Sequence, residues 1–278
     1  MVSSEQRRKQ LAKEKYLRQQ ERRAAARRRA RLRNSGIACG VALVLAAGGA
    51  YAYSGGLNGD EEDDAAENAA AEQEPSKAPD PCDKPGEGKP KGGQWKKEPA
   101  MSIDRSADYA MSLDTTCGDI EIDLDAAKAP HTVNSFNFLA GKGYFDRTRC
   151  HRLVDSSIHV LQCGDPQGTG AGGPGYTIPD ENLKSKKIKG NTYPAGTVAM
   201  ANQYDPQSKK GKNSGGSQFF LVFKDSQLPP YYTPFGKITK GMDTLEKIAG
   251  AGTAMGPQGP TEAPNATVVI KKAEVGTS

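Results

Sequence analysis

Residues 149–163 read Arg149-Cys150-His151-Arg152-Leu153-Val154-Asp155-Ser156-Ser157-Ile158-His159-Val160-Leu161-Gln162-Cys163, which is two short apolar runs around a pair of serines. Short apolar runs that flank turn residues are typical of paired β-strands. We therefore predict one strand at 149–154 and a second at 159–162. The first strand carries Arg152 next to the apolar pair Leu153-Val154, and the second carries a single amide, Gln162, among apolar neighbours.

A third segment, Gly215-Gly216-Ser217-Gln218-Phe219-Phe220-Leu221, adds a second amide and an aromatic side chain to this set. One Arg, two Gln and one Phe suit the binding of an uncharged peptide and a proline ring. They do not suit the binding of a metal or a phosphate, and they contain no activated nucleophile.

The rest of residues 99–278 has the pattern of a mainly β domain. Pro130 is in a position that suits the first turn of a helix. Many short strands with two helices indicate a closed β-barrel capped by helices. The further elements that we predict are strands at 111–115, 120–124, 196–201, 218–222, 235–239 and 266–273, with helices from 130 to about 141 and from 242 to 249.

The composition changes sharply before residue 99. Only 36% of the 278 residues are hydrophobic, whereas ordinary domains have about 45–50% apolar residues. Residues 1–35 are rich in arginine, and we predict a basic, helical cytoplasmic segment there. Residues 36–53 carry no charge, and this length is near the lower limit of roughly 17–25 residues for a membrane span. The basic block before this stretch predicts a cytoplasmic N-terminus and an extracytoplasmic domain.

Cleavage of residues 36–53 as a signal peptide is the alternative, because Ala50-Tyr51-Ala52 fits a small-x-small cleavage site. The basic segment lacks interleaved aromatic residues, so we expect it to contact anionic lipid rather than nucleic acid. Residues 54–98 are first acidic and then rich in proline. Such a segment cannot bury enough apolar surface to fold, and we predict a disordered linker.

Several other kinds of site are excluded by local pattern. Residues 168–173 match G-x-G-x-x-G, but Pro174 follows where a dinucleotide loop must open a helix. Cys150 and His151 are neighbours on a strand, so their side chains point to opposite faces and cannot form a catalytic dyad. The histidines and cysteines show no zinc spacing, and we expect neither a metal nor a cofactor.

The domain resembles the cyclophilin-type peptidyl-prolyl cis-trans isomerases (rotamases) over about residues 100–275. The family implies an eight-stranded antiparallel barrel capped by two helices, without a metal or a cofactor. The motifs that carry the resemblance are Ala129-Pro130-His131-Thr132-Val133-Asn134, Gly143-Tyr144-Phe145-Asp146, His151-Arg152, Gln162-Cys163-Gly164-Asp165-Pro166, Gly172-Gly173-Pro174-Gly175-Tyr176, Met200-Ala201-Asn202, Ser217-Gln218-Phe219-Phe220 and Phe235-Gly236-Lys237.

The resemblance implies roles for individual residues. A prolyl amide rotates slowly, with a barrier of about 18–20 kcal/mol, and catalysis requires a site complementary to the twisted amide. Arg152 is the implied catalytic donor to the prolyl nitrogen, which regains a lone pair as the amide twists. The implied substrate-binding residues are the pocket residues Val160, Phe220 and Leu228, the backbone-binding Gln162 and Asn202, the neighbouring Ala201 and Gln218, and His159 and Tyr232 at positions where the family usually has an aromatic residue and a histidine.

Some positions depart from the family pattern. Two extra residues separate Arg152 from Gln162, and the tryptophan usual near Leu228 is missing. These departures put the shape of the proline pocket and the binding of cyclosporin in question. We expect a prolyl isomerase that acts on proline-containing exported or unfolded chains. The alternative is a catalytically weak cyclophilin-like peptide-binding or chaperone module.

A disulfide between Cys150 and Cys163 stays open at this point. The two cysteines flank the predicted hairpin almost symmetrically. If Arg152 and Gln162 share a face, strict alternation places the cysteines on opposite faces unless a bulge intervenes.

Overall fold

The computed structural model describes residues 79–205, 207–256 and 259–278. The predicted basic segment, the predicted span at 36–53 and the first part of the predicted linker lie outside the described residues. Within the described part, neither α2 (Pro130–Gly141) nor α3 (Met242–Gly250) is long and apolar enough to cross a bilayer.

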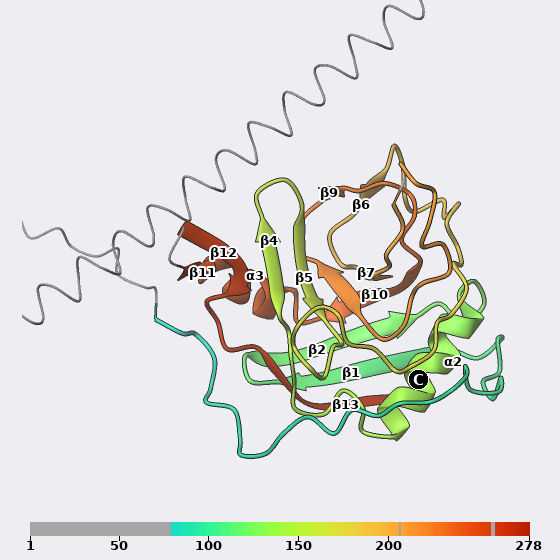
Figure 1. Cartoon of the computed structure of the whole chain (residues 1–278), viewed down its shortest axis with the longest axis horizontal. Helices are drawn as coiled ribbons and strands as arrows, with labels where there is room; N and C mark the ends of the chain where they lie inside the picture. Colours follow the sequence, from blue (N-terminus) through green and yellow to red (C-terminus); the bar gives the residue numbers. More distant parts are fainter. Residues whose placement is uncertain (1–78, 206, 257–258) are drawn as a thin grey trace, which may run out of the picture. The chain divides into compact units, whose positions relative to one another are not determined.

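The described residues form a mainly β domain around one nine-stranded antiparallel sheet (Figure 1). The hydrogen-bonded order of this sheet is β3-β13-β1-β2-β10-β7-β8-β5-β4. Its strands are β1 (Tyr109–Thr115), β2 (Gly118–Leu124), β3 (Thr148–Arg149), β4 (Arg152–Asp155), β5 (His159–Cys163), β7 (Thr197–Met200), β8 (Phe219–Val222), β10 (Pro234–Lys240) and β13 (Val269–Thr277). Two small two-stranded sheets complete the described part: β6 (Thr192–Tyr193) with β9 (Ser226–Gln227), and β11 (Thr253–Gly256) with β12 (Gly259–Pro264).

The prediction of a closed eight-stranded barrel needs correction. Among the described residues the sheet has nine strands, and its order is open from β3 to β4. These edge strands are halves of one bent segment, interrupted at Cys150-His151. The first half pairs with β13 and the second with β5, so the chain itself connects the two edges of a curled sheet.

The interior of the curled sheet is filled by apolar side chains from alternate strand positions and from one face of α2. Phe136 of α2 is fully buried, and its ring centroid lies 4.6 Å from that of Phe235 and 5.4 Å from that of Phe219. Val133 and Leu139 are also fully buried on this face. The predicted helix and its apolar face are therefore confirmed, with Pro130 in the first turn.

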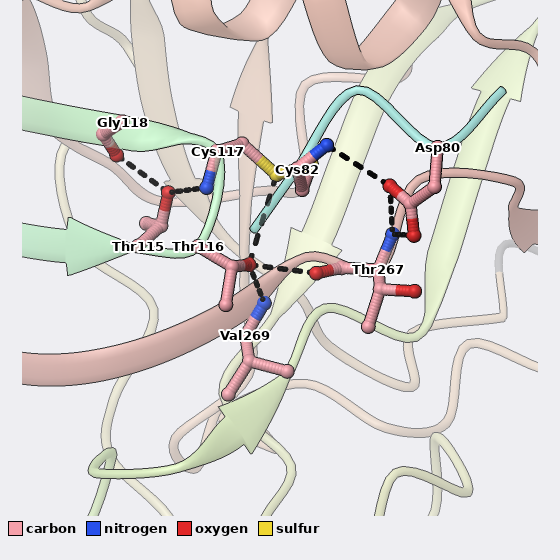
Figure 2. The surroundings of a disulfide bond; sticks show 8 residues. All are labelled: Asp80, Cys82, Thr115, Thr116, Cys117, Gly118, Thr267 and Val269. Atoms are coloured by element: carbon pink, nitrogen blue, oxygen red, sulfur yellow. Dashed lines mark hydrogen bonds between the residues drawn. A yellow bond between two sulfur atoms is a disulfide. The ribbon is translucent and has the colours of Figure 1, made fainter. Parts of the chain in front are cut away.

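Residues 79–98, which we call the strap, pack on this domain although the sequence predicts a linker there. Cys82 forms a disulfide with Cys117 in the β1–β2 turn (Figure 2). The carboxylate of Asp80 accepts hydrogen bonds from the backbone N–H groups of Cys82 and Thr267, at 3.0–3.1 Å. The expectation of disorder is thus wrong for this stretch. Its low apolar content does not fix it on the domain, but the disulfide to Cys117 does.

The other end of the strap is held by Trp95. Its ring centroid lies 5.2 Å from that of Phe138 in α2 and 5.9 Å from that of Tyr144. Its backbone N–H donates to the carbonyl oxygen of Pro174 at 2.8 Å. The strap therefore connects the β1–β2 turn to α2 and to the glycine-rich loop at 168–175.

Candidate active site

A cavity of about 140 Å³ opens on the outer face of strands β4, β5 and β8. It contains eight of the ten side chains that the sequence places in the site. The lining residues are Arg152, Ile158, Val160, Gln162, Ala201, Asn202, Phe220, Leu228 and Tyr232.

The floor of this cavity belongs to a small apolar cluster, separate from the main core. Val160, Phe220 and Leu228 are each less than 10% exposed. The ring of Tyr232 meets the edge of the Phe220 ring, with the centroids 5.4 Å apart at 85°. Strand alternation explains the two clusters, because Val160 and Phe220 point outward while their neighbours Leu161 and Phe219 point into the main core.

Strand register places the cation, the amide and the aromatic ring in one row. Arg152 lies directly opposite Gln162 across β4 and β5, and Gln162 lies directly opposite Phe220 across β5 and β8. Directly opposed residues share a face of the sheet. Since adjacent strands are about 4.8 Å apart, the Cα atoms of Arg152 and Phe220 are separated by roughly 10 Å, which the long Arg side chain can span.

A chain of hydrogen bonds connects this row to the glycine-rich loop. Nη1 of Arg152 donates to Oε1 of Gln162 at 3.4 Å. Nε2 of Gln162 donates to Oε1 of Gln218 at 2.8 Å. Nε2 of Gln218 in turn donates to the carbonyl oxygens of Gly170 and Gly172, at 3.0 and 2.9 Å. Gln218 itself does not line the cavity, but its hydrogen bond orients Gln162, which does.

The glycine-rich loop is organised by a fully buried carboxylate, Asp165. Its oxygens accept the backbone N–H groups of Gln167, Thr169, Gly170 and Gly172, at 2.7–3.1 Å. Burial alone would raise the pKa of this carboxyl, but these backbone hydrogen bonds outweigh burial and hold the pKa below its usual value. In the sequence, Asp165 stands out only as part of a motif, and no pattern around it reveals this role.

Comparison with known protein families identifies the family of this domain. The family model "Cyclophilin type peptidyl-prolyl cis-trans isomerase/CLD" matches residues 110–275. This chain belongs to the cyclophilin family.

Curated relatives of this cyclophilin come from several bacteria. It is 45% identical over 176 residues to a probable peptidyl-prolyl cis-trans isomerase B of Mycobacterium leprae, which covers 60% of this chain and 55% of that protein. It is 41% identical over 133 residues to the peptidyl-prolyl cis-trans isomerase B of Bacillus subtilis, covering 47% of this chain and 82% of that protein. The chain spans about half the length of the mycobacterial relatives that it matches.

A solved cyclophilin-type isomerase from Cryptosporidium parvum aligns with 62% of this chain and 99% of its own, at 27% identity and a TM-score of 0.49. The same protein has also been solved in the presence of the dipeptide Ala-Pro.

Besides Gln218, His159 is the predicted site residue that lies outside the cavity. Its Nδ1 lies 2.6 Å from Oδ1 of Asp155, and its ring meets that of Phe223 at 5.7 Å. Since Val160 and Gln162 face the cavity, strand alternation turns His159 to the opposite face. Ile158, which no sequence motif indicates as a site residue, lines the cavity instead.

Cys150 and Cys163 form a disulfide beside the site, which decides the question that the sequence leaves open. Strand alternation places the two cysteines on opposite faces only if the strand is continuous. The chain is irregular at Cys150-His151, between β3 and β4, and this break turns the buried Cys150 toward Cys163. This break acts as a β-bulge does, because it interrupts the alternation of side chains along the strand.

Another residue missed by sequence reasoning is Glu262 of β12, which forms an ion pair with Arg152. Glu262 follows a glycine- and proline-rich stretch, and no motif or strand pattern there indicates a site residue. The hydrogen bond from Arg152 lowers the pKa of the Glu262 carboxyl, so this partner is ionised near neutral pH.

The site as a whole offers hydrogen-bond donors and an apolar slot rather than a reactive group. Burial lowers the pKa of His151, the neighbour of Arg152, and the ring nitrogens of this histidine have no hydrogen-bond partner among the described residues. In the same part of the chain, no three His, Cys, Asp or Glu side chains lie close enough together to hold a metal ion. The arrangement can therefore bind an uncharged chain and donate hydrogen bonds to it.

Proposed function

We propose that this cyclophilin is a peptidyl-prolyl cis-trans isomerase that stabilises the twisted prolyl amide without a covalent step. The observation that carries the proposal is the row of Arg152, Gln162 and Phe220 across three adjacent strands. It places a guanidinium at a cavity of about 140 Å³ whose floor is apolar. A cavity of about 150 Å³ accommodates one benzene ring, so one proline ring is an occupant of suitable size.

The chemistry follows from the loss of amide resonance during rotation. As the C–N bond twists, the prolyl nitrogen becomes pyramidal and its lone pair becomes a hydrogen-bond acceptor. A guanidinium fixed beside the ring donates to this lone pair in the transition state and not in the planar ground state, which is the condition for catalysis. Val160, Phe220 and Leu228 hold the ring, while Gln162 and Asn202 hold the flanking backbone.

The experiment is a prolyl exchange assay on the full chain with a proline-containing peptide, comparing the native protein with Arg152→Ala. Loss of a preorganised donor costs on the order of 10²–10³-fold in kcat, and we expect a loss of this size. Arg149→Ala is the matched control, because Arg149 is exposed on β3. Binding of the peptide without exchange by the native chain would instead indicate a binding module.

We further propose that the domain acts outside the cytoplasm, on exported chains, and is anchored by residues 36–53. Four of the five cysteines of the chain pair in disulfides, and such bonds persist in oxidising compartments. The uncharged stretch at 36–53 and the basic block before it support the anchor. Protease added to intact cells should digest the domain, and the chain should fractionate with membranes; release of a shortened chain would indicate cleavage after Ala52.

A further inference from the structure

The hairpin β11–β12 brings a carboxylate to the guanidinium of the candidate catalytic residue. Oε2 of Glu262 accepts from Nε of Arg152 at 2.6 Å, and Oε1 of Glu262 accepts from Nη2 at 3.3 Å. We propose that Glu262 is a positioning residue that holds Arg152 in its orientation toward the prolyl amide. This inference rests on the proposed isomerase function.

The contacts of the guanidinium use different edges of the planar group. Glu262 takes the edge formed by Nε and Nη2, and Gln162 takes Nη1. A guanidinium has five N–H donors in a rigid fork, so contacts on two edges fix its rotation about the side-chain axis. Glu262 does not line the cavity, whereas Arg152 does. The carboxylate therefore orients the donor without filling the space for the proline ring.

The hairpin that carries Glu262 is itself held by hydrogen bonds. Oγ1 of Thr261 donates to the carbonyl oxygen of Ala254 at 2.9 Å, and the N–H of Asn265 donates to the carbonyl oxygen of Gly252 at 2.9 Å. Strand β12 lies beside β4, the strand of Arg152 (Figure 1). The carboxylate is thus presented by a hydrogen-bonded element next to the site.

The expected effect is on the rate rather than on stability. The side chains of Arg152 and Glu262 are 36% and 61% exposed, and exposed ion pairs contribute little to stability. Orientation matters more, since misplacement of a catalytic group by about 1 Å can cost on the order of 10²-fold in rate. Because Gln162 still restrains Nη1, we expect a smaller loss, of about 3- to 10-fold in kcat.

A role for Glu262 as a competitor of the substrate would change the rate in the opposite direction. A carboxylate on a guanidinium could compete with the substrate for its donors, in which case removing Glu262 would raise the rate. The sign of the change therefore separates positioning from competition.

The test measures kcat and KM for prolyl exchange on the full chain, for the native protein, Glu262→Gln, Glu262→Ala and Glu262→Asp. Gln removes the charge with little change of shape, and Asp keeps the charge on a shorter side chain. We expect kcat to fall 3- to 10-fold in the Gln and Ala variants, with KM within twofold, and partial recovery in Asp. Glu121→Gln is the control, since Glu121 is a half-buried glutamate of β2 in an ion pair with Lys240.

Two further measurements exclude a merely structural effect. Added salt screens exposed charge pairs, so it should lower the native rate toward that of Glu262→Gln and leave the variant unchanged. On an Arg152→Ala background, Glu262→Gln should have no effect on the rate. An inactive native chain would contradict the proposed function; an active native chain with equal or faster Glu262 variants would contradict this inference alone.

Discussion

The side-chain amides of Gln162 and Gln218 meet at 2.8 Å, from Nε2 of the first to Oε1 of the second, although only Gln162 lines the cavity. Gln218 is held in turn by the carbonyl oxygens of Gly170 and Gly172. The orientation of Gln162, and through it that of Arg152, therefore depends on a residue that need not touch the proline ring.

The first prediction concerns this dependence. Gln218→Ala should lower kcat/KM by about 3- to 10-fold, because loss of one neutral hydrogen bond costs about 0.5–1.5 kcal/mol. Measured together with Gln162→Ala in a double-mutant cycle, the two losses should be clearly less than additive. Gln227→Ala is the control, as Gln227 is an exposed amide of β9 that bonds to Thr192. Fully additive losses would mean that the two amides act separately.

The second prediction separates the two neighbours Ile158 and His159. Ile158 lines the cavity, whereas His159 lies on the other face against Asp155 and Phe223. Ile158→Ala should raise KM about 3- to 10-fold through the loss of roughly 1 kcal/mol of apolar contact with the substrate. His159→Ala should change KM by less than twofold. A larger effect of the histidine variant on KM would return His159 to the binding site.

The predictable parts of the site are those that follow from strand periodicity. Arg152, Gln162 and Phe220 lie on short apolar strands whose residues alternate between two faces, and the predicted strands at 159–162, 196–201 and 218–222 coincide with β5, β7 and β8 to within two residues. Once these strands pair, the three side chains share a face without any further information.

The parts that the sequence does not reveal depend on contacts between distant segments or on interruptions of a strand. Strands β6 and β9 have two residues each, and β11–β12 is rich in glycine and proline, so neither pair has a readable period. The ion pair of Glu262 with Arg152 spans 110 residues. Sequence alone also does not determine which cysteines pair, and for Cys150 the alternation rule fails because the strand breaks there.

The third prediction concerns the buried carboxylate Asp165. Asp165→Asn replaces an ion that accepts four backbone N–H groups, and hydrogen bonds to charged groups are worth about 1.5–3 kcal/mol. We expect the free energy of unfolding near neutral pH to fall by about this amount, as measured by urea titration. Asp119→Asn, at an exposed position of β2, should change it little.

The same variant gives a pH dependence of known sign. The pKa of Asp165 is lowered in the folded chain. Its stabilisation is therefore complete above the unfolded pKa of about 3.9 and is lost as the pH falls through the folded pKa. The difference in unfolding free energy between the native chain and Asp165→Asn should shrink below about pH 4. A difference that stays constant down to the folded pKa would show that the carboxylate's charge is not what stabilises the loop.

The fourth prediction concerns the strap, which lies outside the residues that the cyclophilin family model matches. The Cys82–Cys117 disulfide closes a loop with a sequence separation of 35 residues, and loop-closure entropy gives it about 3–4 kcal/mol of stabilisation. Cys82→Ser with Cys117→Ser should lower the free energy of unfolding by up to this amount. Trp95 is the single tryptophan of the chain, and it packs on Phe138 and Tyr144, so its fluorescence reports whether the strap stays docked.

In the double Ser variant we expect the tryptophan emission to move to longer wavelength at denaturant concentrations where far-UV circular dichroism is still native. None of the residues that line the cavity belongs to the strap. The strap bonds to the carbonyl oxygens of Gly173 and Pro174 in the glycine-rich loop, not to Gly170 or Gly172, which hold Gln218. We therefore expect kcat/KM without denaturant to remain within twofold of the native value. The Cys150–Cys163 disulfide is expected to differ, because Cys150 lies two residues before Arg152 and Cys163 directly follows Gln162. Its replacement by serines should lower kcat/KM in addition to stability, and equal effects of the two disulfides on the rate would contradict this separation of the strap from the site.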